Sequence, residues 1–267
     1  ATDRSGTSAV ACTGNKFESR MVGSRDSVAS PNVILNTIVA ESFADTCDYL
    51  EQAEDFEMAV HDLIKKYATE HQRIVFSGNG YSEEWVEEAK RRGLPNIRTM
   101  VESIQYLCDE KSVQMFERFH VFSRAELESR AEIKYEAYAK AVNIEARSMI
   151  DIASKHIIPA VIRYVTALAT SVNQVHQASS LADTSVQDDL LVEASRLLTE
   201  TKTALQKLVD VMNGVGDRAE GKEQAYYFME QVVPAMENLR KPVDELEMIV
   251  DKNMWPMPSY GDLLFEV

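Results

Sequence analysis

The chain has 267 residues, of which 45% are hydrophobic, and a formal net charge of −15. A chain of this size buries a substantial core, as one large domain or two smaller ones. The acidic balance argues against nucleic acid and against anionic membrane surfaces as partners, because both are bound by clustered Lys and Arg. No run of residues approaches the roughly 18 apolar positions of a membrane span, so we expect no transmembrane segment.

Cysteines and histidines follow no metal-binding pattern in this sequence. The three cysteines, Cys12, Cys47 and Cys108, are far apart and form no C-x-x-C pair, which indicates neither a zinc site nor a disulfide framework and favours a reducing compartment. The histidines form no H-x-x-x-H or H-E-x-x-H pair. We therefore expect a solvated or core-satisfied role for each of His61, His71, His120, His156 and His176.

The N-terminal segment TGNKFESRMVGS, residues 13–24, has the alternation of a β-strand that ends at Gly23. A period of two places Glu18 and Arg20 on the same side of that strand. A carboxylate beside a guanidinium suits a site that holds a divalent metal ion and a transferring phosphoryl group. An ion pair on a solvent-exposed strand has the same spacing, so the residues alone leave both interpretations open.

Beyond residue 30 the pattern is typical of helices, because glycine is absent between Gly93 and Gly214. Pro31 suits the first turn of a helix. Ser82 is a candidate N-cap after the glycine-containing loop FSGNGY. The expected helices of this half are a single helix over Asn32–Thr69, a short helix from Ser82 to Lys90, and helices over Thr99–Cys108 and Asp109–Arg118.

In the second half, Ser123 and Glu126 form an S-x-x-E capping box that begins a very long helix. Pro159 predicts a kink in it near Lys155. Further helices are expected over Ser185–Met212 and over Glu223–Lys252, the latter kinked by Pro234 and Pro242. The buried stripe of the long helix is predicted to be Ile150, Ile157, Ile158, Val161, Ile162, Val165, Leu168, Val172 and Val175. The predicted fold is mainly α, a bundle of long kinked helices with a short N-terminal β-strand.

Several long blocks of the sequence resemble one family. The blocks TGNKFESRMVGS, SPNVILNTIVAE, FSGNGYSEEWVEEAKRRGLPN and ELEMIVDKNMWPMPSYGDLLF occur in the order typical of the C-terminal region of type III glutamine synthetase. The resemblance extends over essentially the whole chain. It implies that residues 1–30 are the last strand and turn of a catalytic domain and that residues 31–267 are a helical C-terminal domain.

The resemblance also implies roles for individual residues. Glu18 matches a metal ligand of the family, Arg20 matches a residue that contacts the transferring phosphoryl group, and Arg4 is assigned to cofactor binding. The family phosphorylates glutamate with ATP and then displaces phosphate with ammonia, and its members assemble as stacked hexameric rings. Mg²⁺ and ATP are therefore expected cofactors if the chain is part of a complete ligase, and none is expected for the chain alone.

The chain departs from the family signature around this strand. Gly6 stands where the family has its second arginine, and Ser19 stands where it has an aromatic residue. Ala9 and Val10 replace a Pro-Phe pair, and Arg25 replaces a small polar residue. Loss of an arginine that contacts phosphate removes a charge-assisted donor, which costs about 2–4 kcal/mol of transition-state stabilisation.

Two hypotheses follow for the function. The preferred one is a non-catalytic helical protein that acts as a structural or docking subunit of a larger assembly or homo-oligomer, joined through the N-terminal strand and the aromatic segment MWPMPSYGDLLF. The alternative is the C-terminal part of an active ATP-dependent glutamate–ammonia ligase. The chain starts without Met, so we interpret it as a processed form or a fragment. The expected location is the cytoplasm or the plastid stroma.

Overall fold

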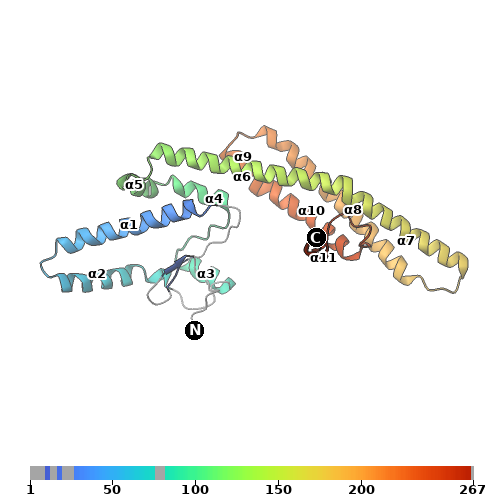
Figure 1. Cartoon of the computed structure of the whole chain (residues 1–267), viewed down its shortest axis with the longest axis horizontal. Coiled ribbons are helices and arrows are strands. Elements are labelled where there is room, and N and C mark those ends of the chain that lie inside the picture. Colours follow the sequence, from blue (N-terminus) through green and yellow to red (C-terminus); the bar gives the residue numbers. More distant parts are fainter. Residues whose placement is uncertain (1–9, 13–16, 20–26, 76–81, 266–267) are drawn as a thin grey trace. The chain divides into compact units, whose positions relative to one another are not determined.

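The computed structural model describes residues 10–12, 17–19, 27–75 and 82–265. By its contacts the chain divides into two compact units, Ala1–Glu128 and Ser129–Val267. Helices dominate both units, so the predicted mainly helical fold is confirmed (Figure 1). The division at residue 30, which separates a catalytic remnant from the helical part, stays a prediction.

The first unit begins with a helical hairpin made of α1 (Ala29–Glu51) and α2 (Phe56–Glu70). The single helix expected over Asn32–Thr69 is therefore wrong. Asp55 separates the two helices, because its side chain accepts a hydrogen bond from the Met58 amide at 3.0 Å and caps the N-terminus of α2. A hydrogen bond links the two helices of the hairpin, because the Thr46 hydroxyl of α1 lies 3.4 Å from the Tyr67 hydroxyl of α2.

Short helices complete the first unit and agree with the prediction. They are the 3₁₀ turn η1 (Gln72–Ile74), α3 (Glu83–Arg91), α4 (Met100–Ile104), the 3₁₀ turn η2 (Gln105–Leu107) and α5 (Glu110–Arg118). The Ser82 side chain caps α3 as expected by accepting from the Trp85 amide. Arg118 ties α5 to α1, since its guanidinium donates to Asp45 at 2.6 Å.

The corner between α5 and α6 (Arg124–Ile152) carries the predicted capping box. The Ser123 amide donates to the Glu126 carboxylate at 2.8 Å, and the Glu126 amide donates back to the Ser123 hydroxyl at 3.4 Å. Val113, Phe116 and Leu127 form a small buried core beside this corner. The capping residues thus fix the direction in which α6 begins.

The second unit is a bundle of long helices. The continuation of α6 is followed by the π-helical turn η3 (Ala153–Ile157), α7 (Ile158–Ala178), α8 (Ser185–Asn213) and the 3₁₀ turn η4 (Gly214–Asp217). The last rod consists of α9 (Lys222–Tyr227), the π-helical turn η5 (Phe228–Val232) and α10 (Val233–Ile249). In Figure 1 α8 lies beside both α7 and α10, in agreement with the contacts that it makes with each of them.

Both π-helical turns precede a proline. Proline has no amide hydrogen and its ring clashes with the carbonyl four residues earlier, so an ordinary α-helical turn is disfavoured there. Before Pro159 the Ile158 amide instead bonds to the Ala153 carbonyl, five residues back. Before Pro234 the Val233 amide bonds to the Phe228 carbonyl in the same way. The predicted distortion near Lys155 is confirmed as a π turn.

The core of the second unit is arranged in two clusters. One joins α6, α8 and the last rod through residues that include Val142, Leu208, Phe228 and Leu239. The other joins α7, α8 and α10 through residues that include Val161, Leu197 and Leu246. The predicted stripe on α7 supplies Ile157 and Val161 to the second cluster. Ile162 is an exception, because half of its surface is exposed.

The aromatic C-terminal segment folds back in part on the second cluster. Met254 and Trp255 pack against it, and the Trp255 indole donates to the Glu247 carboxylate at 3.1 Å. The following helix α11 (Tyr260–Phe265) leaves Tyr260 86% exposed. The segment therefore combines an anchored half with an exposed half. Among the described helices, none has a stretch long and apolar enough to cross a lipid bilayer.

Gly221 allows a close approach at the start of α9. Its φ is +81°, and a Cβ atom there would overlap the Glu132 carboxylate. We expect Gly221→Ala to lower the free energy of unfolding by about 1–3 kcal/mol, measured by urea denaturation. The Glu132 carboxylate is the end of an exposed, flexible side chain that can move away, so the loss should come mainly from the backbone conformation and Glu132→Ala should recover little of it.

Gly216→Ala is the matched control, because Gly216 lies on the same connection in open space and without a positive φ. It should change stability by no more than about 0.5 kcal/mol. Equal stability losses in Gly216→Ala and Gly221→Ala would contradict the close approach.

Asp262 holds the C-terminal segment. Hydrogen bonds, first from Lys252 and then from Ser259, lower the pKa of Asp262 from its ordinary value of 3.8 to about 2. The carboxylate therefore stabilises the folded segment above about pH 3.8, and this contribution is lost as the pH falls toward 2. Lys252→Met should raise the pKa of Asp262 in an NMR titration, whereas Lys241→Met should not. An unchanged pKa in Lys252→Met would contradict this contact.

Candidate functional site

The strand that carries Glu18 is present and is paired. Strand β2 (Phe17–Ser19) runs antiparallel to β1 (Val10–Cys12), with Ala11 opposite Glu18. The prediction of a strand at Glu18 is therefore confirmed. Its partner β1 was not predicted, and one backbone edge of β2 is occupied by it. A three-residue strand such as β1 is too short to show an alternating pattern.

The remaining predicted site residues lie outside the described residues. These are Arg20, Arg4 and the signature position Gly6. The metal-ligand role of Glu18 and the phosphoryl contact of Arg20 therefore stay predictions. Within the described part of the chain, no group of three or more His, Cys, Asp or Glu side chains is placed to hold a metal ion.

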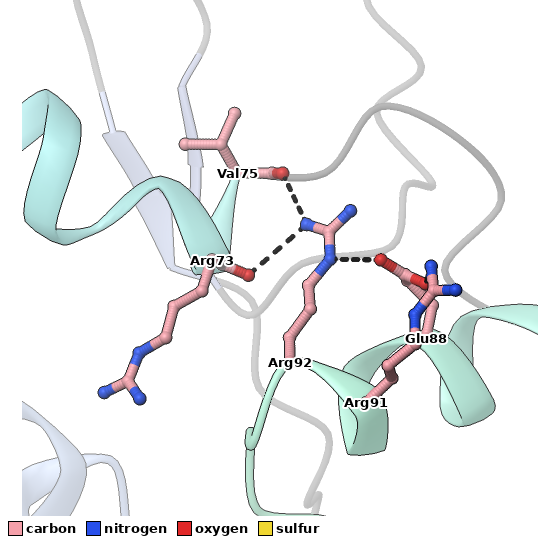
Figure 2. Close-up of polar contacts among 5 residues, drawn as sticks. All are labelled: Arg73, Val75, Glu88, Arg91 and Arg92. Atoms are coloured by element: carbon pink, nitrogen blue, oxygen red, sulfur yellow. Dashed lines mark hydrogen bonds and ion pairs between the residues drawn. The ribbon is translucent and has the colours of Figure 1, made fainter.

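A polar cluster in the first unit is centred on Arg92, at the end of α3 (Figure 2). Its Nε donates to Glu88 Oε1 at 2.5 Å. Its Nη1 donates to the Val75 carbonyl at 2.9 Å and to the Arg73 carbonyl at 3.3 Å. The guanidinium also lies over the Trp85 ring, 5.6 Å from the centroid. Arg92 thus fastens the backbone that follows α2 to α3.

Glu88 is the anionic partner in this cluster. The hydrogen bond from Arg92 lowers the pKa of Glu88, and the charge of Arg91 adds to the effect. Glu88 and Arg92 are four residues apart, a spacing that brings the two side chains together on a helix. That spacing was visible in the sequence. The contact to Val75 was not, because residues that distant along the chain meet only through the fold.

A second polar network closes the turn between α7 and α8. The buried Thr184 hydroxyl donates to Asp188 Oδ2 at 2.8 Å and lies 3.0 Å from His176 Nε2. Since the single hydroxyl hydrogen is directed to Asp188, Nε2 of His176 donates to Thr184. Arg92 binds backbone carbonyls, and the Thr184 network joins the end of α7 to the start of α8.

Comparisons with known proteins agree with the sequence resemblance. Residues 59–176 match the model of the glutamine synthetase C-terminal domain. The type-3 glutamine synthetase of Dictyostelium discoideum is 36% identical over 99% of this chain and 37% of its own length. The glutamine synthetase of Bacteroides fragilis strain YCH46 is 31% identical over 99% of this chain and 37% of its own length.

A third relative, the glutamine synthetase of Butyrivibrio fibrisolvens, is 32% identical over 100% of this chain and 38% of its own length. The chain thus spans a little over a third of the length of these relatives. The matches include the strand that carries Glu18, because they cover almost every residue. By this similarity, the chain belongs to the type-3 glutamine synthetase family and carries its C-terminal domain.

Proposed function

We propose that this chain is the C-terminal, mainly helical part of an ATP-dependent glutamate–ammonia ligase that makes glutamine. The observation that supports this most directly is the similarity to three glutamine synthetases over 99–100% of the chain, the segment of Glu18 included. The helical units then support the segments of the complete polypeptide that form the active site. Consistent with this, the two polar networks of the helical units hold backbone segments.

In this proposal Glu18 and Arg20 are the residues of the chain that reach the reacting groups. Glu18 supplies one carboxylate oxygen, the hard type of ligand that Mg²⁺ prefers. ATP, when bound, would supply the phosphoryl group that activates glutamate for attack by ammonia, and Mg²⁺ would neutralise charge on that group. Arg20 stabilises the negative charge on that group through charge-assisted hydrogen bonds. One carboxylate does not complete a Mg²⁺ site, so the further ligands come from water, substrate or other chain segments.

A second candidate function, a non-catalytic docking subunit, is favoured by one feature of the sequence. Gly6 stands at a position where the family signature has an arginine. The missing donor would lower the rate by about 30- to 1,000-fold if no other cation replaces it. Gly6→Arg in the complete natural polypeptide distinguishes the candidates: little or no glutamine formation before the substitution favours the docking role, whether or not the arginine restores it, and substantial glutamine formation that the substitution leaves unchanged favours the ligase.

The site assignment is tested by Glu18→Gln in the complete natural polypeptide. Outer-shell residues of metal sites already cost 10- to 100-fold when replaced. We therefore expect loss of a direct ligand to raise the Mg²⁺ concentration for half-maximal glutamine formation by at least about tenfold. Glu237→Gln, at an exposed position of α10, is the matched control. An unchanged Mg²⁺ dependence in Glu18→Gln would remove Glu18 from the metal site.

A further inference from the structure

The backbone that follows α2 is positioned by hydrogen bonds more than by burial. Ile74 is 61% exposed and Val75 is 68% exposed, so neither side chain fixes this segment through the core. The Ile74 amide donates to the His71 carbonyl at 3.0 Å, and the Val75 amide donates to the Gln72 carbonyl at 3.1 Å. These local bonds connect the segment to the end of α2. Its position relative to α3 depends on contacts of longer range.

Arg92 makes such a longer-range contact from the end of α3, as Figure 2 shows. Its Nη1 donates to the Val75 carbonyl at 2.9 Å and to the Arg73 carbonyl at 3.3 Å, although these residues lie 17 and 19 positions earlier in the chain. Hydrogen bonds from a charged donor are stronger than those between neutral groups. Arg92 thus fixes the backbone of both residues against α3.

The guanidinium of Arg92 is itself held on two sides. Glu88, one helical turn earlier, accepts from Nε at 2.5 Å, and the Trp85 ring centroid lies 5.6 Å away. Gly93, with a φ of +70°, follows Arg92 directly and ends the helix. A cation at this end of a helix is favoured by the helix dipole. Because the side chain is already ordered, it loses less conformational entropy when it binds the carbonyls.

The strand pair that carries Glu18 lies beside this backbone. Strands β1 and β2 belong to the same compact unit as α3. In Figure 1 the pair lies between the end of α2 and α3, and in Figure 2 its ribbons pass next to Val75. Each strand has three residues, and a two-stranded pair of this kind is marginally stable by itself. Its position therefore depends on the elements next to it.

We propose that Arg92 is a positioning residue for the metal site, which holds the Glu18 strand in place through the backbone of Arg73 and Val75. The inference rests on the proposed function, in which Glu18 binds Mg²⁺. Mg²⁺ demands nearly ideal octahedral geometry, so a displaced ligand costs affinity. Groups that orient metal ligands typically change metal affinity or activity 10- to 100-fold. Arg92 acts through the strand and does not touch the metal ion.

Metal binding by the complete natural polypeptide tests this role. Mn²⁺ prefers the same oxygen ligands as Mg²⁺ and is titrated by electron paramagnetic resonance; the relevant site is the one that Glu18→Gln weakens. Arg92→Met removes the guanidinium and keeps a long unbranched side chain. We expect it to raise the Mn²⁺ dissociation constant at least about tenfold. Arg92→Lys keeps the charge without the planar fork of donors, so its effect should be intermediate.

The same variants are expected to separate two kinetic quantities. In Arg92→Met the Mg²⁺ concentration for half-maximal glutamine formation should rise in parallel with the Mn²⁺ dissociation constant. The kcat at saturating Mg²⁺ should fall less, because excess metal ion restores occupancy of the site. Hydrogen exchange adds a readout that needs no metal ion. Peptides that cover residues 17–19 should exchange faster in Arg92→Met, since the strand opens more easily.

Two arginines of the same unit provide matched controls. Arg91 also pairs with Glu88, and its side chain is 78% exposed. Arg118 ties α5 to α1 through Asp45, so its loss weakens the unit without reaching the backbone after α2. Arg91→Met and Arg118→Met should each leave the Mn²⁺ dissociation constant within about twofold of the wild-type value.

A double variant separates positioning from a general structural role. If Arg92 acts through Glu18, the combination of Glu18→Gln with Arg92→Met should bind Mn²⁺ no more weakly than Glu18→Gln alone. Additive losses, an unchanged Mn²⁺ affinity in Arg92→Met, an equal loss in Arg118→Met, or Mn²⁺ binding that Glu18→Gln leaves unchanged would overturn the inference. Mn²⁺ binding that depends on both residues in a polypeptide that forms no glutamine would support the inference and contradict the ligase alone.

Discussion

The absence of an amide hydrogen at Pro159 and Pro234 is the constraint on which the helical bundle depends. Each proline is preceded by a hydrogen bond that spans five residues, from Ile158 to Ala153 and from Val233 to Phe228. An extra residue in a turn rotates everything that follows by about 100° around the helix axis. The two π turns therefore decide which faces of α7 and α10 point into the core.

The sequence predicted those features that depend on local chemistry. Pro159 located the distortion of the long helix, and the Ser123 capping box located its start, because both act within one turn of the chain. The break before Asp55 was missed, although Asp55 is a good N-cap, because the apolar pattern continues across it. The exposure of Ile162 was missed because Ile162 lies at the edge of the face that buries Val161, and an apolar residue at such an edge leaves the same pattern in the sequence.

The candidate site was predictable only in part. The alternation of residues predicted the strand at Glu18, and the resemblance to a family gave the predicted metal-ligand role of Glu18. The networks of Arg92 and Thr184 were not predictable, since they join atoms that the fold brings together from different elements. Both networks join neighbouring elements of the fold. Positioning residues of this kind leave a sequence signal only where they pair within one helix, as Glu88 and Arg92 do.

In the proposed function, the chemistry takes place at the Glu18 strand and in further chain segments, and the helical units support it. The most direct measurement compares glutamine formation from glutamate, ATP and ammonium by the 267-residue chain and by the complete natural polypeptide that contains it, at equal molar concentration. The proposed function predicts Mg²⁺-dependent glutamine formation by the complete polypeptide and none by the 267-residue chain. Glutamine formation by the 267-residue chain alone would contradict it.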